Sequence, residues 1–232
     1  MLFRSQLASE LLGIDPSKIE IAMGDSDRVG GVGSMGSRSA YIGGSAVLTG
    51  SEKLVEKGKE LAADALEAAT ADIVYSAGRF TIAGTDRAVD FGQLAARQPD
   101  KRIFIENVNT VDGIAWPNGA HVGEVEIDPE TGRVELVRYT TVDDVGRPLH
   151  RPIVFGQIHG GVAQGIGQAL LESAVYDKSG QLLSGSMMDY TMPRADNLPS
   201  FNVATENTMC THNPLGSKGC GEVGAIGSPP AI

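Results

Sequence analysis

Cysteine is scarce in this sequence, which has only Cys210 and Cys220 among its 232 residues. Two cysteines are too few for a disulfide framework, and their separation does not match a CxxC metal or redox motif. They also cannot provide the four thiolates of a typical iron–sulfur cluster. The sequence therefore excludes a disulfide-rich scaffold, a CxxC-type metal domain and a cluster bound by this chain alone.

Positive charge and long apolar runs are scarce as well. The chain has 19 Lys and Arg against 29 Asp and Glu, a net charge of -10, which argues against a nucleic-acid partner because such a partner needs a basic face. No run of about 18 apolar residues occurs, so we expect no membrane span. The N-terminal segment has no apolar stretch long enough for a secretory signal.

The hydrophobic pattern predicts helices that alternate with short strands and hairpins. This order favours an α+β fold with mixed sheets and packed helices over a doubly wound parallel sheet. We expect two α/β subdomains, residues 1–115 and 116–232. The expected helices cover residues 2–12, 39–69, 90–96 and 153–174. The expected strands cover residues 18–23, two short stretches within 73–82, a hairpin of 121–128 with 133–142, and a strand–turn–strand over 174–183, before a loop-rich tail.

Glycine is abundant, with 30 residues, and one cluster lies in the loop at residues 30–39. This loop contains a GxGxxG pattern, but it is long for a strand-to-helix turn and Glu52 lies inside the following helix, so a nicotinamide-binding fingerprint fails on context. Backbone N–H groups, Ser37, Arg38 and Ser39 at a helix N-terminus suit a phosphate or another anionic group. The alternative is a plain glycine-rich turn with a serine cap.

A second cluster places five glycines within residues 156–170, inside a predicted helix. Each glycine costs about 1 kcal/mol of helix stability relative to alanine, so a compensating role is expected. Either the helix packs tightly against another backbone, or its glycine face admits a flat ligand while Gln157 and Gln164 offer amides two turns apart. His159 is more typical of a hydrogen-bonded structural histidine than of a metal ligand.

The third segment of interest surrounds Glu222, which small residues flank on both sides. Such a carboxylate is accessible, and beside a ligand it can act as a general base. Cys220 is an alternative nucleophile or soft-metal ligand. We disfavour that alternative because no His/Asp set lies nearby and Lys218 is the only activating charge.

Taken together, six segments in this order resemble the large, molybdenum-binding subunits of the xanthine dehydrogenase / aldehyde oxidase / carbon monoxide dehydrogenase family, in their C-terminal portion. The segments are GSMGSRSAYIGGSAV, HVGEVEIDPETGRVELVRY, VDDVGRPL, GQIHGGVAQGIGQALLE, GSMMDYTMPRADNLP and NPLGSKGCGEVGAIGSPPAI. Any one of them could arise by chance, but the ordered set spans nearly the whole chain.

The resemblance implies roles for individual residues. Glu222 matches the glutamate of a KGxGE-type motif, the general base beside molybdenum. No residue of this chain is expected to bind the metal directly. The residues that match cofactor-binding motifs are Gln157 and Gln164 of the glutamine–glycine helix, Met35, Gly36, Ser37, Arg38 and Ser39 of the loop around the pterin phosphate or dinucleotide tail, and Lys218, four residues before the base.

The resemblance also implies an activity and partners. We expect oxidative hydroxylation of an aldehyde or a purine-like N-heterocycle, with water as oxygen donor. The expected cofactor is a molybdenum–pterin, in its molybdopterin cytosine dinucleotide form, with iron–sulfur clusters and FAD on an iron–sulfur subunit and a flavin subunit. The expected location is the cytoplasm, with periplasmic export through a partner's signal as the alternative.

The sequence also departs from the family pattern. It lacks the GQG-type pterin loop and the half of the subunit that precedes it, so we expect the chain to need the rest of the molybdenum subunit and to be inactive alone. Aldehydes, purines, other N-heterocycles and carbon monoxide stay open as substrates. Two other functions also stay open: a non-catalytic cofactor-domain fragment or assembly module, and a nucleotide-binding enzyme that uses GVGSMG.

Overall fold

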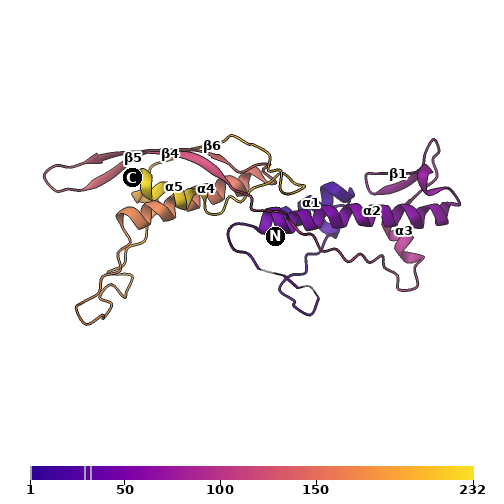
Figure 1. Ribbon diagram of the computed structural model, residues 1–232, viewed down its shortest axis with the longest axis horizontal. Coiled ribbons are helices and arrows are strands. Elements are labelled where there is room, and N and C mark those ends of the chain that lie inside the picture. Colours follow the sequence, from indigo (N-terminus) through magenta and orange to yellow (C-terminus); the bar gives the residue numbers. More distant parts are fainter. Residues whose placement is uncertain (1, 29, 32) are drawn as a thin grey trace. The chain divides into compact units, whose positions relative to one another are not determined.

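A computed structural model describes residues 2–28, 30–31 and 33–232 (Figure 1). The contacts between residues divide the chain into two units, each described here by itself. The first unit comprises Met1–Gly33, Ser39–Asp112 and Asn213–Leu215, and the second comprises Ser34–Arg38, Gly113–His212 and Gly216–Ile232. The short loop Ser34–Arg38 is thus grouped with residues that follow it only from Gly113 onward. The division into two subdomains, residues 1–115 and 116–232, stays a prediction.

The first unit is built on one long helix and a small antiparallel sheet. Its elements are α1 (Leu2–Leu12), η1 (Pro16–Lys18), η2 (Ser39–Gly43), α2 (Gly44–Leu66), η3 (Thr70–Asp72), β1 (Ile73–Ser76), β2 (Arg79–Ile82), β3 (Ala88–Asp90) and α3 (Phe91–Ala96). The sheet has the order β1-β2-β3, and both of its strand pairs are antiparallel. The predicted helices and the two short strands of this half are therefore confirmed.

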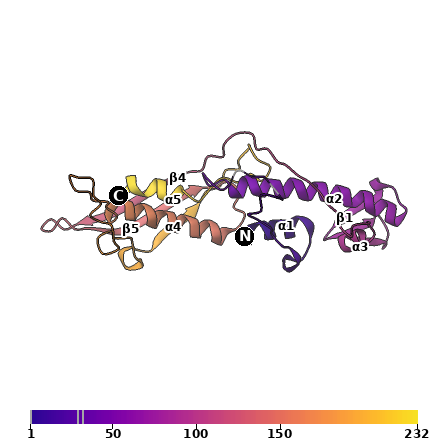
Figure 2. The ribbon, with the colours of Figure 1, turned by 90° about the horizontal axis from the view of Figure 1, so that it is seen from below.

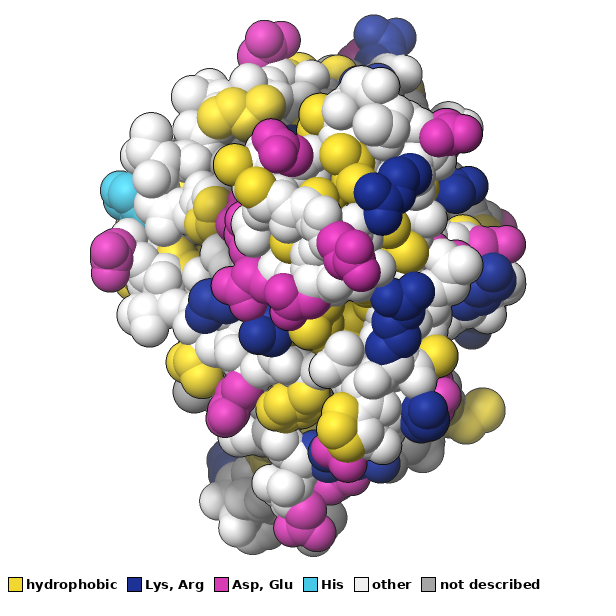
Figure 3. Space-filling view, turned by 90° about the vertical axis from the view of Figure 1, so that its right-hand side faces the viewer, with side chains coloured by type: hydrophobic (Ala, Val, Ile, Leu, Met, Phe, Trp, Pro, Cys, Tyr) yellow, Lys and Arg dark blue, Asp and Glu magenta, His cyan; other side chains and the backbone are white. Residues whose placement is uncertain are grey.

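The core of the first unit lies between α2 and this sheet. Phe80 is fully buried, and its ring packs against the rings of Tyr75 and Phe91. On the exposed side of α2, Lys57 and Glu60 form an ion pair at 2.9 Å. Figure 3 shows acidic and basic side chains interspersed on the face that it presents.

The strand predicted over residues 18–23 is wrong. Lys18 ends η1, and the chain from there to Met23 has no regular secondary structure. Asp15 accepts a hydrogen bond from the Ser17 backbone N–H at 2.9 Å, which starts the tight turn that includes Lys18. The alternation of polar and apolar residues is present, but the two sheets of the described residues include no strand that pairs with this segment. Alternation without a partner does not form a strand.

The second unit contains a mixed sheet and two packed helices. Its elements are β4 (Asn118–Ile127), β5 (Val134–Asp144), α4 (Arg151–Leu170), η4 (Ala195–Asn197), β6 (Phe201–Thr205) and α5 (Val223–Ala231). The predicted hairpin is β4 with β5, an antiparallel pair that is interrupted between Glu124 and Val125, whereas β6 joins β5 in parallel. Mixed sheets with packed helices confirm the α+β class.

Helices α4 and α5 lie along one face of this sheet (Figures 1 and 2). Tyr139 of β5, Ile158 and Val162 of α4, and Val223 of α5 are all buried in the shared core. This arrangement fixes the start of α5, and with it the residue that precedes the helix, against the sheet and α4. None of the helices of the described residues is long and apolar enough to cross a membrane.

The glycines of α4 serve two different purposes. A Cβ added at Gly161 would lie 3.0 Å from the backbone nitrogen of Ala225, and one at Gly165 would overlap the side chain of Ser228, so both allow α5 to approach closely. Gly156 and Gly160, by contrast, have no heavy atom within 4 Å of an added Cβ. Tight backbone packing, the first of the two alternatives, therefore accounts for only part of the glycine cluster.

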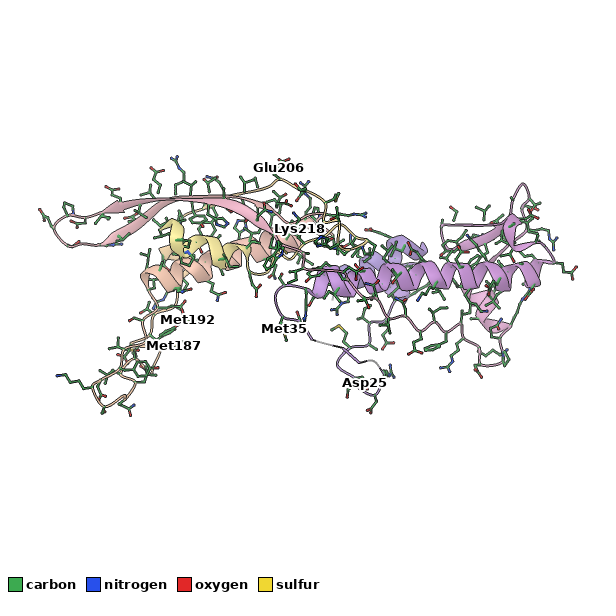
Figure 4. The ribbon with its side chains drawn as sticks, in the orientation of Figure 1. Asp25, Met35, Met187, Met192, Glu206 and Lys218 are labelled. Carbon is green, nitrogen blue, oxygen red and sulfur yellow. The ribbon has the colours of Figure 1, made fainter. Side chains whose placement is uncertain are left out.

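Two elements were not foreseen in the tail, namely β6 and α5. The stretch 174–183, expected as strand–turn–strand, forms only an isolated bridge between Tyr176 and Leu182. The stretch lies in the long loop between α4 and η4, which also carries the exposed Met187 and Met192 (Figure 4). Strand β6 is five residues long and pairs with a strand far away in the sequence, so no local turn marks it.

Replacing Gly224 by Ala tests the close approach of α5 to α4. The added Cβ would lie 2.5 Å from both the carbonyl oxygen of Ile158 and the backbone nitrogen of Val162, and backbone atoms cannot move aside. We expect the free energy of unfolding to fall by about 1–3 kcal/mol, measured by urea denaturation. The matched control Gly160→Ala, on the open side of α4, should be neutral or stabilise by up to about 1 kcal/mol. Equal effects of the two variants would contradict the packing argument.

Candidate functional site

Three segments that are far apart in the sequence meet in the second unit. The backbone N–H of Gly221 donates a 2.7 Å hydrogen bond to the Ser37 hydroxyl. A Cβ added at Gly219 would lie 2.7 Å from the Ser37 Cβ, and one at Gly221 would lie 3.5 Å from the Gln157 side-chain oxygen. Only glycine permits this approach at Gly219. The loop Ser34–Arg38, helix α4 and the segment before α5 therefore form one site.

The loop Ser34–Arg38 is a tight turn that presents Ser37. Gly36 and Ser37 have φ angles of 56° and 54°, in the left-handed region, where the non-glycine residue is strained. The backbone N–H of Arg38 bonds the carbonyl oxygen of Met35 at 3.4 Å across the turn. Met35 is exposed at the tip of the loop (Figure 4). Ser39 is the first residue of η2 and belongs to the other unit.

Two glutamines line the open side of α4. Gln157 and Gln164 are both exposed, and their separation of seven residues places them two turns apart on one face of the helix. Gly156 and Gly160 lie next to Gln157 and leave the helix backbone uncovered there. Amide side chains beside a bare strip of backbone offer donors and acceptors to a flat ligand.

Glu222 immediately precedes α5 and has an exposed side chain. Its side chain makes no capping hydrogen bond to the helix, although this position commonly provides one. The next residues, Val223 and Gly224, are buried against α4. The backbone of Glu222 is thus held by a packed helix, while its carboxylate has no structural task in α5.

Lys218 has a partner inside the second unit. Its ammonium group lies 2.6 Å from the Asp144 carboxylate, and the two side chains are 10% and 11% exposed. The Asp144 carboxylate also accepts hydrogen bonds from the backbone N–H groups of Gly146 and Thr208, at 2.9 and 3.1 Å. Burial by itself would raise the pKa of Asp144, but the hydrogen bond from Lys218 and the two backbone bonds outweigh it, so the pKa lies below its usual value.

The neighbouring Asp143 anchors a second buried network. Its carboxylate accepts a hydrogen bond from the Thr141 hydroxyl at 2.7 Å and lies 3.1 Å from His121 Nε2. The other ring nitrogen of His121 lies 2.7 Å from the Tyr139 hydroxyl. Burial first, and then the charge of Asp143, raise the pKa of Tyr139 to about 12, although a hydrogen bond with Ser228 lowers it. This phenol therefore stays protonated and keeps its hydrogen bonds.

The surroundings of Cys220 argue against a reactive thiol. Burial, and to a smaller extent the charge of Asp143, raise the pKa of the Cys220 thiol. The thiolate is the reactive form, so these surroundings disfavour the nucleophilic role considered for this residue. The Nδ1 of His159 donates a 2.7 Å hydrogen bond to the carbonyl oxygen of Phe155, as a structural histidine does. Among the described residues, no group of three or more His, Cys, Asp or Glu side chains could hold a metal ion.

Sequence reasoning named the segments of the site but missed the residues that join them. It did not find the contact between Ser37 and Gly221, or the partners of Lys218 and His121 at the end of β5. The signal that was available is the pair Asp143-Asp144 in VDDVGRPL, where two consecutive carboxylates end a strand. Successive strand residues face opposite sides, so two adjacent aspartates serve two different networks.

Comparison with known proteins assigns the family. The family model described as the molybdopterin cofactor-binding domain matches residues 4–199. The chain is 34% identical to the 6-hydroxypseudooxynicotine dehydrogenase complex subunit gamma of Paenarthrobacter nicotinovorans and 31% identical to the carbon monoxide dehydrogenase large chain of Hydrogenophaga pseudoflava, with 98% of this chain covered in both cases. It spans 30% of the length of each of these two relatives.

A solved structure supports the same assignment. Quinoline 2-oxidoreductase from Pseudomonas putida 86 superimposes with a TM-score of 0.85 and 32% identity, covering 99% of this chain and 30% of that one. The two relatives and this structure match nearly the whole chain, whereas the family model covers the loop Ser34–Arg38 and helix α4 and ends at residue 199, before the segment that leads to α5. The chain therefore belongs to the molybdopterin cofactor-binding domain family, in the molybdenum-binding large subunits of the xanthine dehydrogenase / aldehyde oxidase / carbon monoxide dehydrogenase group, as its six segments indicated.

Proposed function

We propose that this chain provides one wall of the cofactor site of a molybdenum hydroxylase, with Glu222 as the general base. The reaction is the oxidative hydroxylation of an aldehyde or an N-heterocycle, with water as the oxygen donor. The observation that carries the proposal is the hydrogen bond from Gly221 to Ser37, because it joins the turn to the segment of Glu222. The side-chain oxygen of Gln157 lies 3.5 Å from a Cβ added at Gly221, which brings the glutamine helix beside the same point. These segments would otherwise be three separate glycine-rich stretches.

The chemistry of the site fits a pterin with a phosphate-containing tail. Its polar groups are hydroxyls, amides and backbone N–H groups, which suit heterocycle edges and phosphate oxygens. The bare backbone at Gly156 and Gly160 leaves space for a flat ring system. The residues that would hold the cofactor, in the molybdopterin cytosine dinucleotide form, are Gln157, Gln164, Met35, Gly36, Ser37, Arg38 and Ser39. When bound, the cofactor supplies the two-electron redox chemistry.

The residues of the chain have separate tasks in this proposal. The Glu222 carboxylate removes a proton from the water-derived oxygen as that oxygen attacks the substrate carbon. Gln157 orients the reacting groups from α4, because its side-chain oxygen lies beside Gly221, next to the base. The packed start of α5 holds the backbone of Glu222 in place. The protein thus contributes position and proton transfer.

The relatives point to partners for the electrons. One relative carries the words "complex subunit" in its name and another the words "large chain", so both are parts of larger assemblies. We propose that the rest of the molybdenum subunit completes the pocket, and that an iron–sulfur subunit and a flavin subunit carry the electrons away. The two cysteines of this chain are too few to provide the four thiolates of a typical cluster.

An isotope experiment tests the proposed function. The purified complex that contains this chain is analysed for molybdenum and for cytidine monophosphate released by acid, and is assayed with quinoline and benzaldehyde in ¹⁸O-labelled water. We expect stoichiometric molybdenum, released cytidine monophosphate and ¹⁸O in the hydroxylated product. A hydroxylated product without ¹⁸O, whose oxygen then comes from dioxygen, would contradict the mechanism. Molybdenum without turnover of any aldehyde or N-heterocycle would favour a non-catalytic cofactor module.

A further inference from the structure

The chain segment that leads to Glu222 is fastened to the end of the mixed sheet. The backbone N–H of Arg147 donates to the carbonyl oxygen of Gly216 at 2.8 Å, and that of Lys218 donates to the carbonyl oxygen of Val145 at 2.9 Å. The Ser217 hydroxyl donates to the Arg147 carbonyl oxygen at 2.8 Å. These bonds hold residues 216–218 beside the turn that follows β5, as a short antiparallel bridge.

The buried ion pair of Lys218 with Asp144 adds a side-chain anchor to this bridge. Asp144 is the last residue of β5, and two backbone N–H groups besides Lys218 fix its carboxylate. Charge-assisted hydrogen bonds are shorter and roughly twice as strong as neutral ones. The pair of Lys57 with Glu60 in the other unit is different. Its side chains are 48% and 61% exposed, so it is not held in a buried position. The Lys218–Asp144 pair is therefore buried and held by further hydrogen bonds, whereas the Lys57–Glu60 pair is a solvent-exposed ion pair.

Only three residues separate this anchor from Glu222. Two of them, Gly219 and Gly221, pack against Ser37, and beyond Glu222 the helix α5 is locked onto α4 at Gly224. The segment between Lys218 and Gly224 is thus held at both ends and supported in the middle. A displacement of the Lys218 end would move the base and leave the helix end in place.

We propose that Lys218 and Asp144 are a positioning pair for Glu222, and that Lys218 acts through the base and does not bind the cofactor. The inference rests on the proposed function of Glu222. It replaces the cofactor-binding role that the family motif implied for Lys218, because its ammonium group is buried against a carboxylate of the same chain. Lys218 is therefore a positioning residue in this scheme.

The first test replaces Lys218 by Met in the complete cofactor-loaded complex. A displacement of about 1 Å at a catalytic group costs roughly 100-fold in rate, so we expect kcat with quinoline or benzaldehyde to fall by about that factor. The KM and the molybdenum content should stay at the wild-type values. Lys218→Arg keeps the charge and should recover part of the kcat. The matched control Lys57→Met removes the exposed pair and should change none of these quantities.

A double variant separates positioning from cofactor binding. In the Glu222→Gln background, Lys218→Met should cost less than about twofold, because a residue that acts through the base has no further effect once the base is absent. Amide hydrogen exchange over residues 216–222 should be faster in Lys218→Met, even in the enzyme without substrate. Asp144→Asn combined with Lys218→Met removes both charges, so this variant keeps the test valid where the single variant unfolds.

Three results would overturn the inference. They are a molybdenum content that falls together with kcat, a full additional loss of rate in the Glu222→Gln background, and unchanged hydrogen exchange over residues 216–222. The first two would make Lys218 a cofactor ligand. Failure of the proposed function has a different signature, because Glu222→Gln by itself would then leave kcat unchanged.

Discussion

Replacing Glu222 by Gln in the cofactor-loaded complex should lower kcat by about 10²–10⁴-fold, the range over which a positioned general base contributes. Gln has nearly the same size and shape as Glu but cannot take up a proton. The side chain makes no capping hydrogen bond to α5, so the substitution removes no contact of the helix. Molybdenum content and the thermal stability of the complex should therefore remain at wild-type levels.

The matched control is Glu206→Gln. Glu206 is an exposed glutamate of the same unit, and Figure 4 shows it on the segment that follows β6. Steady-state kinetics in a dye-reduction assay with quinoline or benzaldehyde should show no change for this variant. If Glu222→Gln retained kcat within about tenfold, the base would have to be another group. A parallel loss of molybdenum would instead assign Glu222 to cofactor retention.

The elements that the sequence predicts well are those whose signals are local. The hairpin of β4 and β5 has strict alternation around a Gly-closed turn, and the helix α3 has a complete capping box between Asp90 and Gln93. Both signals lie within a few residues of the element that they specify. The segment 18–23 has one of the same signals, alternation, but no partner strand, and it does not form a strand.

The elements that escaped prediction depend on distant parts of the chain. Strand β6 exists because it pairs in parallel with β5, some sixty residues earlier. Helix α5 contains Pro229 and Pro230, which ordinarily oppose a helix, and its glycines are poor helix formers. Its packing against α4 through Gly161 and Gly224 compensates for this composition. Propensity alone therefore gave the wrong structure for this stretch.

The same distinction applies to the candidate site. Its chemical groups could be named from motifs, since Glu222, Gln157 and the turn around Ser37 each have a recognisable local pattern. That these groups lie close together could not be predicted, because the hydrogen bond between Ser37 and Gly221 joins residues 184 positions apart. The partner of Lys218 is 74 residues away and is visible only once β5 ends beside the bridge. The catalytic and cofactor roles themselves stay predictions.

Replacing Asp144 by Asn should destabilise the protein strongly near neutral pH. Lys218 would keep a buried charge without its carboxylate, and breaking such a pair costs about 3–5 kcal/mol in the free energy of unfolding. The measurement is urea denaturation of the purified protein that contains this chain, at pH values from 7 down to about 2.5. The control Glu60→Gln, in the exposed pair with Lys57, should cost less than about 1 kcal/mol at every pH.

The pH dependence identifies the ionised carboxylate as the source of this stabilisation. The pKa of Asp144 is lower in the folded protein than its usual value, because the bonds from Lys218, Gly146 and Thr208 outweigh burial. Its contribution is therefore complete above the unfolded pKa of about 3.9 and is lost as the pH falls through the folded pKa. The difference between wild type and Asp144→Asn should accordingly be largest near pH 7 and narrow below about pH 4. An equal difference at pH 7 and pH 3 would mean that the side chain stabilises by shape, and Lys218 would then lack a charged anchor.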